Sequence, residues 1–149
     1  MRIRHLLLAA LLMVPSMFPL RAESPKQPQE ETELEDKMDV MDTAFRKLKR
    51  QVNDATQNAA SLQLVATIRL GAEEAVKLVP AKAADVPAAE RAKFVADYQM
   101  KMKDLLTTLE KLEVTLRADK NDEAARLVAE LGVMQKVGHK TFKRPDEKE

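Results

Sequence analysis

The sequence predicts an all-α domain, an antiparallel up-down-up-down four-helix bundle. Glycine is rare, with three in 149 residues, and aromatics make up 3%, so the core must be built from Leu, Val, Met and Ala. Along four segments the apolar residues recur in steps of three and four, which is the period of an amphipathic helix. The links between these segments are short, and short links join antiparallel neighbours.

Both ends of the chain are expected to lie outside the bundle. Residues 1–22 resemble a cleavable signal peptide, because two arginines precede an apolar run that is too short to span a bilayer comfortably. A retained membrane anchor is the alternative. Residues 23–31 (ESPKQPQEE) are polar, contain two prolines and predict a disordered leader. The domain is then expected over residues 32–144, with a charged tail at 145–149.

The first helix is expected over residues 33–58. Thr32 and Glu35 have the spacing of a capping box, which places the helix start near residue 32. One apolar face follows, formed by Leu34, Met38, Met41, Phe45, Leu48, Val52, Ala55 and Ala59. The other face is charged and is interpreted as solvated, with Asp39, Asp42, Arg46 and Lys49 as examples.

The remaining helices follow the same reasoning. A break at residues 58–61, with Ser61 as a cap, starts a second helix that ends before Pro80. After the connection 80–87, the third helix is expected from Ala88 to about Ala118. The polar turn 119–122 (DKND) leads into the fourth helix, expected over residues 123–142. Its inner row is Val128, Leu131, Gln135, Gly138 and Phe142.

Charge and cysteine content exclude several functions. The chain carries 25 basic and 24 acidic side chains, and loss of Arg2, Arg4 and Arg21 with the signal peptide takes the formal net charge from +1 to −2. This balance gives no support to nucleic acid as a partner. Without cysteine there can be no disulfide, no thiolate metal site and no covalent haem attachment.

His139 is the only histidine that remains after signal removal, and it lies near the end of the fourth helix. Met38 lies near the start of the first helix. In an up-down-up-down bundle these two helices are neighbours, and both residues lie about 6 to 8 Å in from the same end. An imidazole and a thioether at one depth, between apolar walls, are the ligands that suit haem iron. The alternatives remain a surface histidine favoured by the helix dipole and an ordinary core methionine.

The chain resembles the cytochrome b-562 family in three motifs. Residues 33–39 (ELEDKMD) are similar to the family's opening segment, and residues 122–125 (DEAA) to the start of its fourth helix. Residues 137–143 (VGHKTFK) are similar to its ending, in which a histidine is followed by an aromatic and a basic residue. Phe94 and Tyr98 match an aromatic pair of the family, four residues apart.

The resemblance implies a four-helix protein that binds haem b without covalent attachment. Met38 and His139 would be the axial ligands of the iron, and Phe94 and Tyr98 would line the pocket. With both axial positions filled, electron transfer is implied and an enzyme is not. We therefore expect a monomeric electron carrier in the periplasm, which meets a redox partner protein, no nucleic acid and, after signal removal, no membrane.

Several points stay open at this stage. Gly138 stands where the family commonly has an aromatic residue, so the orientation of the neighbouring imidazole is less determined. Met41, one turn after Met38, is an alternative thioether ligand. A di-iron site would need Glu-x-x-His, and Lys136 precedes His139 by three residues, which excludes it. The competing function is a haem-free periplasmic helical bundle that acts in binding or as a chaperone.

Overall fold

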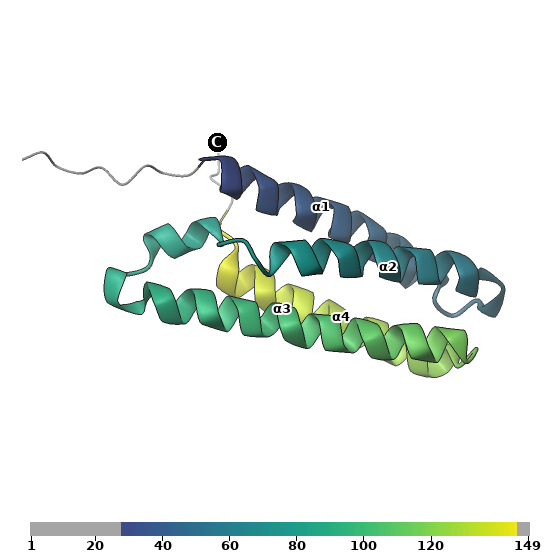
Figure 1. Cartoon of the computed structure of the whole chain (residues 1–149). Helices are drawn as coiled ribbons and strands as arrows, with labels where there is room; N and C mark the ends of the chain where they lie inside the picture. The colour runs from purple at the N-terminus through teal and green to yellow at the C-terminus, as the bar shows by residue number, and fades with distance from the viewer. Residues whose placement is uncertain (1–27, 146–149) are drawn as a thin grey trace, which may run out of the picture.

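The structure, a computed structural model, describes residues 28–145, with side chains from residue 33 onward. Four long helices follow one another in antiparallel order, and none of the residues in this range forms a strand (Figure 1). They are α1 (Pro28–Gln51), α2 (Asn58–Ala75), α3 (Ala88–Arg117) and α4 (Asn121–Phe142), with short 3-10 helices η1 (Ala55–Gln57) and η2 (Ala81–Asp85) between them. The predicted all-α four-helix bundle is confirmed.

The N-terminal boundary differs from the sequence prediction. Because α1 begins at Pro28, residues 28–31 are helical and do not belong to a disordered leader. Proline suits the first helical turn, where its missing N–H has no partner to lose, and the Gln-Glu-Glu that follows favours helix. The predicted signal peptide, the rest of the leader and residues 146–149 lie outside the described part of the chain. No described helix is long and apolar enough to cross a membrane.

The break between α1 and α2 comes earlier than the apolar period suggested. α1 ends at Gln51, and the carboxylate of Asp54 accepts a hydrogen bond from the backbone N–H of Thr56 at 2.9 Å, which caps η1. Ser61, predicted as a helix cap, lies inside α2 and is buried. Its hydroxyl accepts a hydrogen bond of 3.0 Å from the side-chain amide of Gln51. The turn-forming Asn-Asp pair at 53–54 therefore ends the helix despite the continuing row of alanines.

The end of the bundle that holds η1 and the α3–α4 turn is closed by a polar cluster. The amide of the buried Asn58 donates to the carboxylate of Asp119 at 2.8 Å and to the carbonyl of Leu116 at 3.3 Å. The amide of Asn121 donates to the carbonyl of Val52 at 2.7 Å and to the side-chain oxygen of Asn58 at 2.8 Å. These bonds join the α1–α2 connection to the α3–α4 turn. The largest fully buried apolar side chains are Leu48, Val65, Leu109, Leu112 and Leu116.

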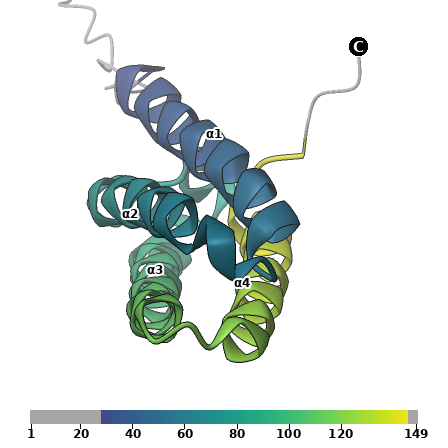
Figure 2. The ribbon, with the colours of Figure 1, turned by 90° about the vertical axis from the view of Figure 1, so that its right-hand side faces the viewer.

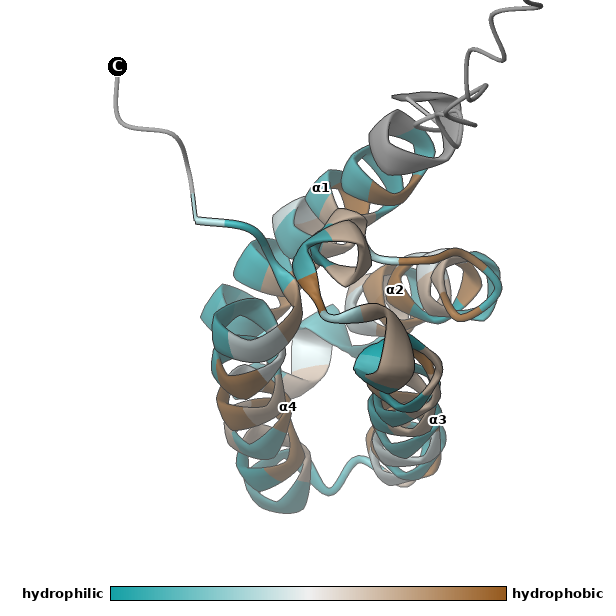
Figure 3. Cartoon of the chain, turned by 90° about the vertical axis from the view of Figure 1, so that its left-hand side faces the viewer, coloured by the Kyte–Doolittle hydropathy of each residue, from teal (hydrophilic) through white to brown (hydrophobic). Residues whose placement is uncertain are grey.

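The opposite end, where α1 starts and α4 ends, is more open. Packing is extensive between α1 and α2, between α2 and α3 and between α3 and α4, but sparse between α1 and α4. Figure 2 shows α1 leaning away from α4 toward its own N-terminal end, and Figure 3 shows the same separation from the other side. Several apolar side chains at this end are only half-buried, namely Met38, Val76, Leu78, Phe94 and Phe142. The candidate ligands Met38 and His139 therefore lie at the less tightly packed end of the bundle.

Candidate functional site

Three aromatic side chains meet at the open end of the bundle. The ring of Phe142 on α4 packs edge-on against those of Phe94, at 5.3 Å, and Tyr98, at 5.5 Å between centroids. Tyr98 is 3% exposed, and its hydroxyl donates a hydrogen bond of 2.8 Å to the carbonyl of Ala75 at the end of α2. Burial raises the pKa of this phenol well above its usual range. The group forms an apolar wall that α2, α3 and α4 hold together.

Phe142 was not among the residues singled out for the site. Its position three residues after His139 was visible in the sequence, but a terminal phenylalanine is ordinary core by pattern alone. In the structure it links the two aromatic residues of α3 to the last turn of α4. Phe142 therefore connects the aromatic wall to the turn of α4 that carries His139.

The register between α1 and α4 is defined by two contacts. A methyl group added at Gly132 would lie 3.8 Å from the ring of Phe45. One turn further, the amide of Gln135 donates a hydrogen bond to the carboxylate of Asp42. Both helices advance by the same number of residues between these contacts, as antiparallel neighbours do.

Continuing that register by one more turn brings Met38 and His139 to facing edges of the two helices. Each lies four residues beyond a member of the hydrogen-bonded pair, in the direction of the open end. Here His139 is exposed and Met38 is half-buried. Figure 2 shows α1 leaning away from α4 toward its N-terminal end. Both predicted ligands therefore lie at the open end of the bundle, one on α1 and one on α4, each four residues beyond the Asp42–Gln135 pair.

Met41 lies in a different environment from Met38. It is 7% exposed, and its side chain fills the space above Gly71, where an added Cβ would stand 2.6 Å from the Met41 Cγ. The glycine lets α1 approach α2 closely at this turn. The Met41 side chain is therefore part of the contact between α1 and α2, whereas Met38 lies on the side of α1 nearer α4.

The last turn of α4 is held by the connection between α2 and α3. The ammonium of Lys82 donates to the carbonyl of Lys140 at 3.4 Å, and Arg144 pairs with the carboxylate of Asp85 at 2.8 Å. Arg91 at the start of α3 donates in turn to carbonyls of η2. These contacts hold the turn that carries His139, and none of them involves α1.

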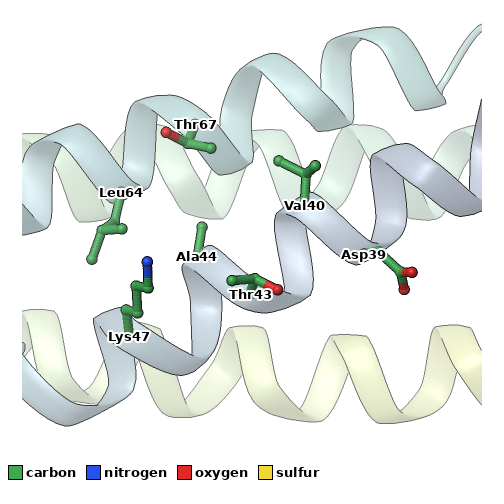
Figure 4. Close-up of a pocket in the computed structure, with 7 residues that line it drawn as sticks. All are labelled: Asp39, Val40, Thr43, Ala44, Lys47, Leu64 and Thr67. Carbon is green, nitrogen blue, oxygen red and sulfur yellow. The ribbon is translucent and has the colours of Figure 1, made fainter.

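The side chains at this end fit a haem. They offer one imidazole, one thioether and an apolar wall that includes aromatic rings, which is the donor set and lining that a b-type haem takes. Among the residues described, no group of three His, Cys, Asp or Glu side chains could hold a metal ion on its own. A shallow hollow lies elsewhere, between α1 and α2 (Figure 4), on the edge of α1 away from α4, and it is lined by Asp39, Val40, Thr43, Ala44, Lys47, Leu64 and Thr67.

The comparisons with known proteins give one match. A family model described as cytochrome b562 matches residues 33–143, which is most of the chain and includes all four helices. Searches of curated proteins and of solved structures found no match. The matched range begins in the first turns of α1 and ends just after the last turn of α4.

Proposed function

The chain belongs to the cytochrome b562 family, and from this membership we propose that it carries single electrons on a non-covalently bound haem b, with Met38 and His139 as axial ligands. The family is a periplasmic one of haem-binding electron carriers, and residues 1–22 would serve as the export signal of this member. The protein would act as a monomer that exchanges electrons with a partner protein.

The register of α1 against α4 is the observation that carries the ligand assignment. Phe45 lies beside Gly132, and Gln135 donates to Asp42 three residues further along each helix. The same register, extended by four residues on each helix, would bring the thioether of Met38 and the imidazole of His139 toward one another from different helices. Met41 is a poorer candidate for the thioether ligand, because its side chain packs against Gly71 on α2.

A haem bound here would supply a one-electron couple at its iron. The chain's residues determine how that couple behaves: the soft thioether of Met38 favours the reduced state, and the apolar wall disfavours the extra charge of the oxidised state. With Met38 and His139 both holding the iron, no open site would be left on it for a substrate. His139 and Met38 sit on helices rather than loops, which limits their movement between the two oxidation states.

The visible spectrum of the mature protein mixed with haem tests the proposal. We expect the sharp α and β bands of a six-coordinate, low-spin ferrous haem with one equivalent bound. A protein that takes up no haem, or binds it without these bands, would contradict the electron-carrier function and leave a haem-free binding or chaperone-like bundle as the alternative.

Single substitutions then assign the ligands. Met38→Ala should convert the spectrum to a high-spin or histidine-only form, and His139→Ala should abolish the low-spin species. Met41→Ala is the matched control, since it removes a thioether one turn away and should keep the low-spin bands even where it weakens folding. A low-spin spectrum that survives Met38→Ala but not Met41→Ala would move the ligand to Met41.

A further inference from the structure

Asp42 and Gln135 form the only hydrogen bond between α1 and α4 among the residues described. The Gln135 amide donates to one carboxylate oxygen of Asp42, while Arg46 approaches the other at 3.5 Å. The Asp42 side chain is 33% exposed, so the bond lies partly out of water. A carboxylate acceptor and partial burial both strengthen a hydrogen bond. The sequence-based interpretation of Asp42 as part of a solvated charged face is therefore wrong.

Among the described side chains of α1 and α4, this pair is the hydrogen-bonded contact nearest the open end. Other bonds tie α1 to α2 alone: Lys37 pairs with Glu74 at 2.6 Å, and Gln51 donates to Ser61 at 3.0 Å. Between α1 and α4 the packing is sparse, and α1 leans outward toward its N-terminal end (Figure 2). The Asp42–Gln135 pair therefore lies between the closed end of the bundle and the turn that carries the two proposed ligands.

We propose that Asp42 and Gln135 are positioning residues of the haem site, which fix the spacing and register of α1 and α4 beneath Met38 and His139. The inference rests on the proposed function, since it concerns the same two ligands. Each ligand lies four residues from a member of the pair, about 6 Å along its helix. A change in helix spacing at the pair is therefore carried to the ligand turn, where both axial bonds must form at once.

An isosteric exchange tests this role. Gln135→Glu places two carboxylates together and should separate the helices, whereas the double variant D42N/Q135E restores an amide and a carboxylate of the same lengths with the same net charge. We expect Gln135→Glu to speed haem dissociation about tenfold, the loss expected for one hydrogen bond to a charged group. It should also weaken the methionine–iron charge-transfer band. The double variant should return both properties close to those of the wild type.

The haem-free protein provides a second readout. The chain has no cysteine, so spin labels can be attached through D39C on α1 and K140C on α4, both at exposed positions. Gln135→Glu should lengthen and broaden the distance distribution between the labels, and the double variant should narrow it again. Circular dichroism of each variant shows whether the helices remain folded. Arg46→Gln is the control, because it removes the other partner of Asp42 without affecting α4.

Two outcomes would overturn the positioning role. One is a Gln135→Glu protein whose label distances and haem dissociation match those of the wild type. The other is a double variant as impaired as Gln135→Glu, since this would assign the defect to the new carboxylate rather than to the lost bond. A wild-type protein that binds no haem would instead refute the proposed function, and with it any role of the pair in holding haem ligands.

Discussion

Replacing each of the three glycines by alanine tests the packing of Gly71 against Met41, with Gly132 and Gly138 as controls. Gly71 on α2 and Gly132 and Gly138 on α4 all have ordinary helical backbone, so replacement by alanine should favour each helix by about 1 kcal/mol. The added Cβ meets different surroundings. At Gly71 it would stand 2.6 Å from the Cγ and 3.1 Å from the sulfur of Met41, at Gly132 3.8 Å from Phe45, and at Gly138 nothing lies within 4 Å.

The expected changes in unfolding free energy follow from these distances. Overpacking costs about 1 to 3 kcal/mol, so Gly71→Ala should range from neutral to about 2 kcal/mol destabilising after the helix gain is subtracted. Gly132→Ala and Gly138→Ala should each stabilise the protein by up to about 1 kcal/mol. Urea unfolding of the haem-free protein, followed by circular dichroism, measures all three. A Gly71→Ala protein as stable as the Gly138→Ala protein would refute the close approach of α1 to α2 at Met41.

Two further predictions concern buried polar groups. Tyr98→Phe should destabilise the protein by about 1 kcal/mol, because the carbonyl of Ala75 loses the Tyr98 hydroxyl and keeps only the backbone N–H of Leu78 as a donor. The pKa of Tyr98 is raised in the folded state, so its contribution to stability is complete below about pH 10, the ordinary tyrosine pKa, and declines above it. Tyr98 is the only tyrosine, so an ultraviolet titration should show ionisation displaced to higher pH than in the unfolded chain, and a titration at the ordinary pKa would contradict the burial. Asn58→Ala should cost about 2 kcal/mol in urea unfolding, since it removes hydrogen bonds to Asp119 and Asn121, yet leave the haem spectrum unchanged because the cluster lies at the other end. A changed spectrum would show that the two ends are coupled.

Helix number and direction could be predicted because they depend on short-range periodicity and on link length. The third and fourth helices were placed within two residues of their observed bounds, since proline and the DKND turn mark their ends. The end of α1 was misplaced by seven residues. Ala55 and Ala59 continue the apolar row there, but alanine contributes little to burial and does not outweigh the Asn53-Asp54 turn signal.

The candidate site could be predicted in part. Met38 and His139 were placed at one depth because helix rise and topology alone determine depth. The contact of Asp42 with Gln135 could not be found in this way, because it depends on how far each helix is rotated about its axis. The sequence pattern predicts that a charged residue at the margin of an apolar stripe faces solvent. Only the structure shows that Asp42 accepts a hydrogen bond from a residue on the neighbouring helix. The packing of Met41 against Gly71 depends on the α1–α2 approach in the same way.

The difference between the two ends of the bundle explains how core residues and the proposed ligand Met38 can share one stripe. Met41, Phe45 and Leu48 follow Met38 along the same face of α1 and are buried, while Met38 alone among the four stays half-buried. The closed end, with its fully buried leucines and polar cluster, holds the helices together whether or not the open end is filled. A haem that enters between α1 and α4 would therefore complete the packing rather than displace core side chains. The sequence pattern does not show how exposed each residue of the stripe is, and it is exposure that separates the half-buried Met38 from the buried Met41.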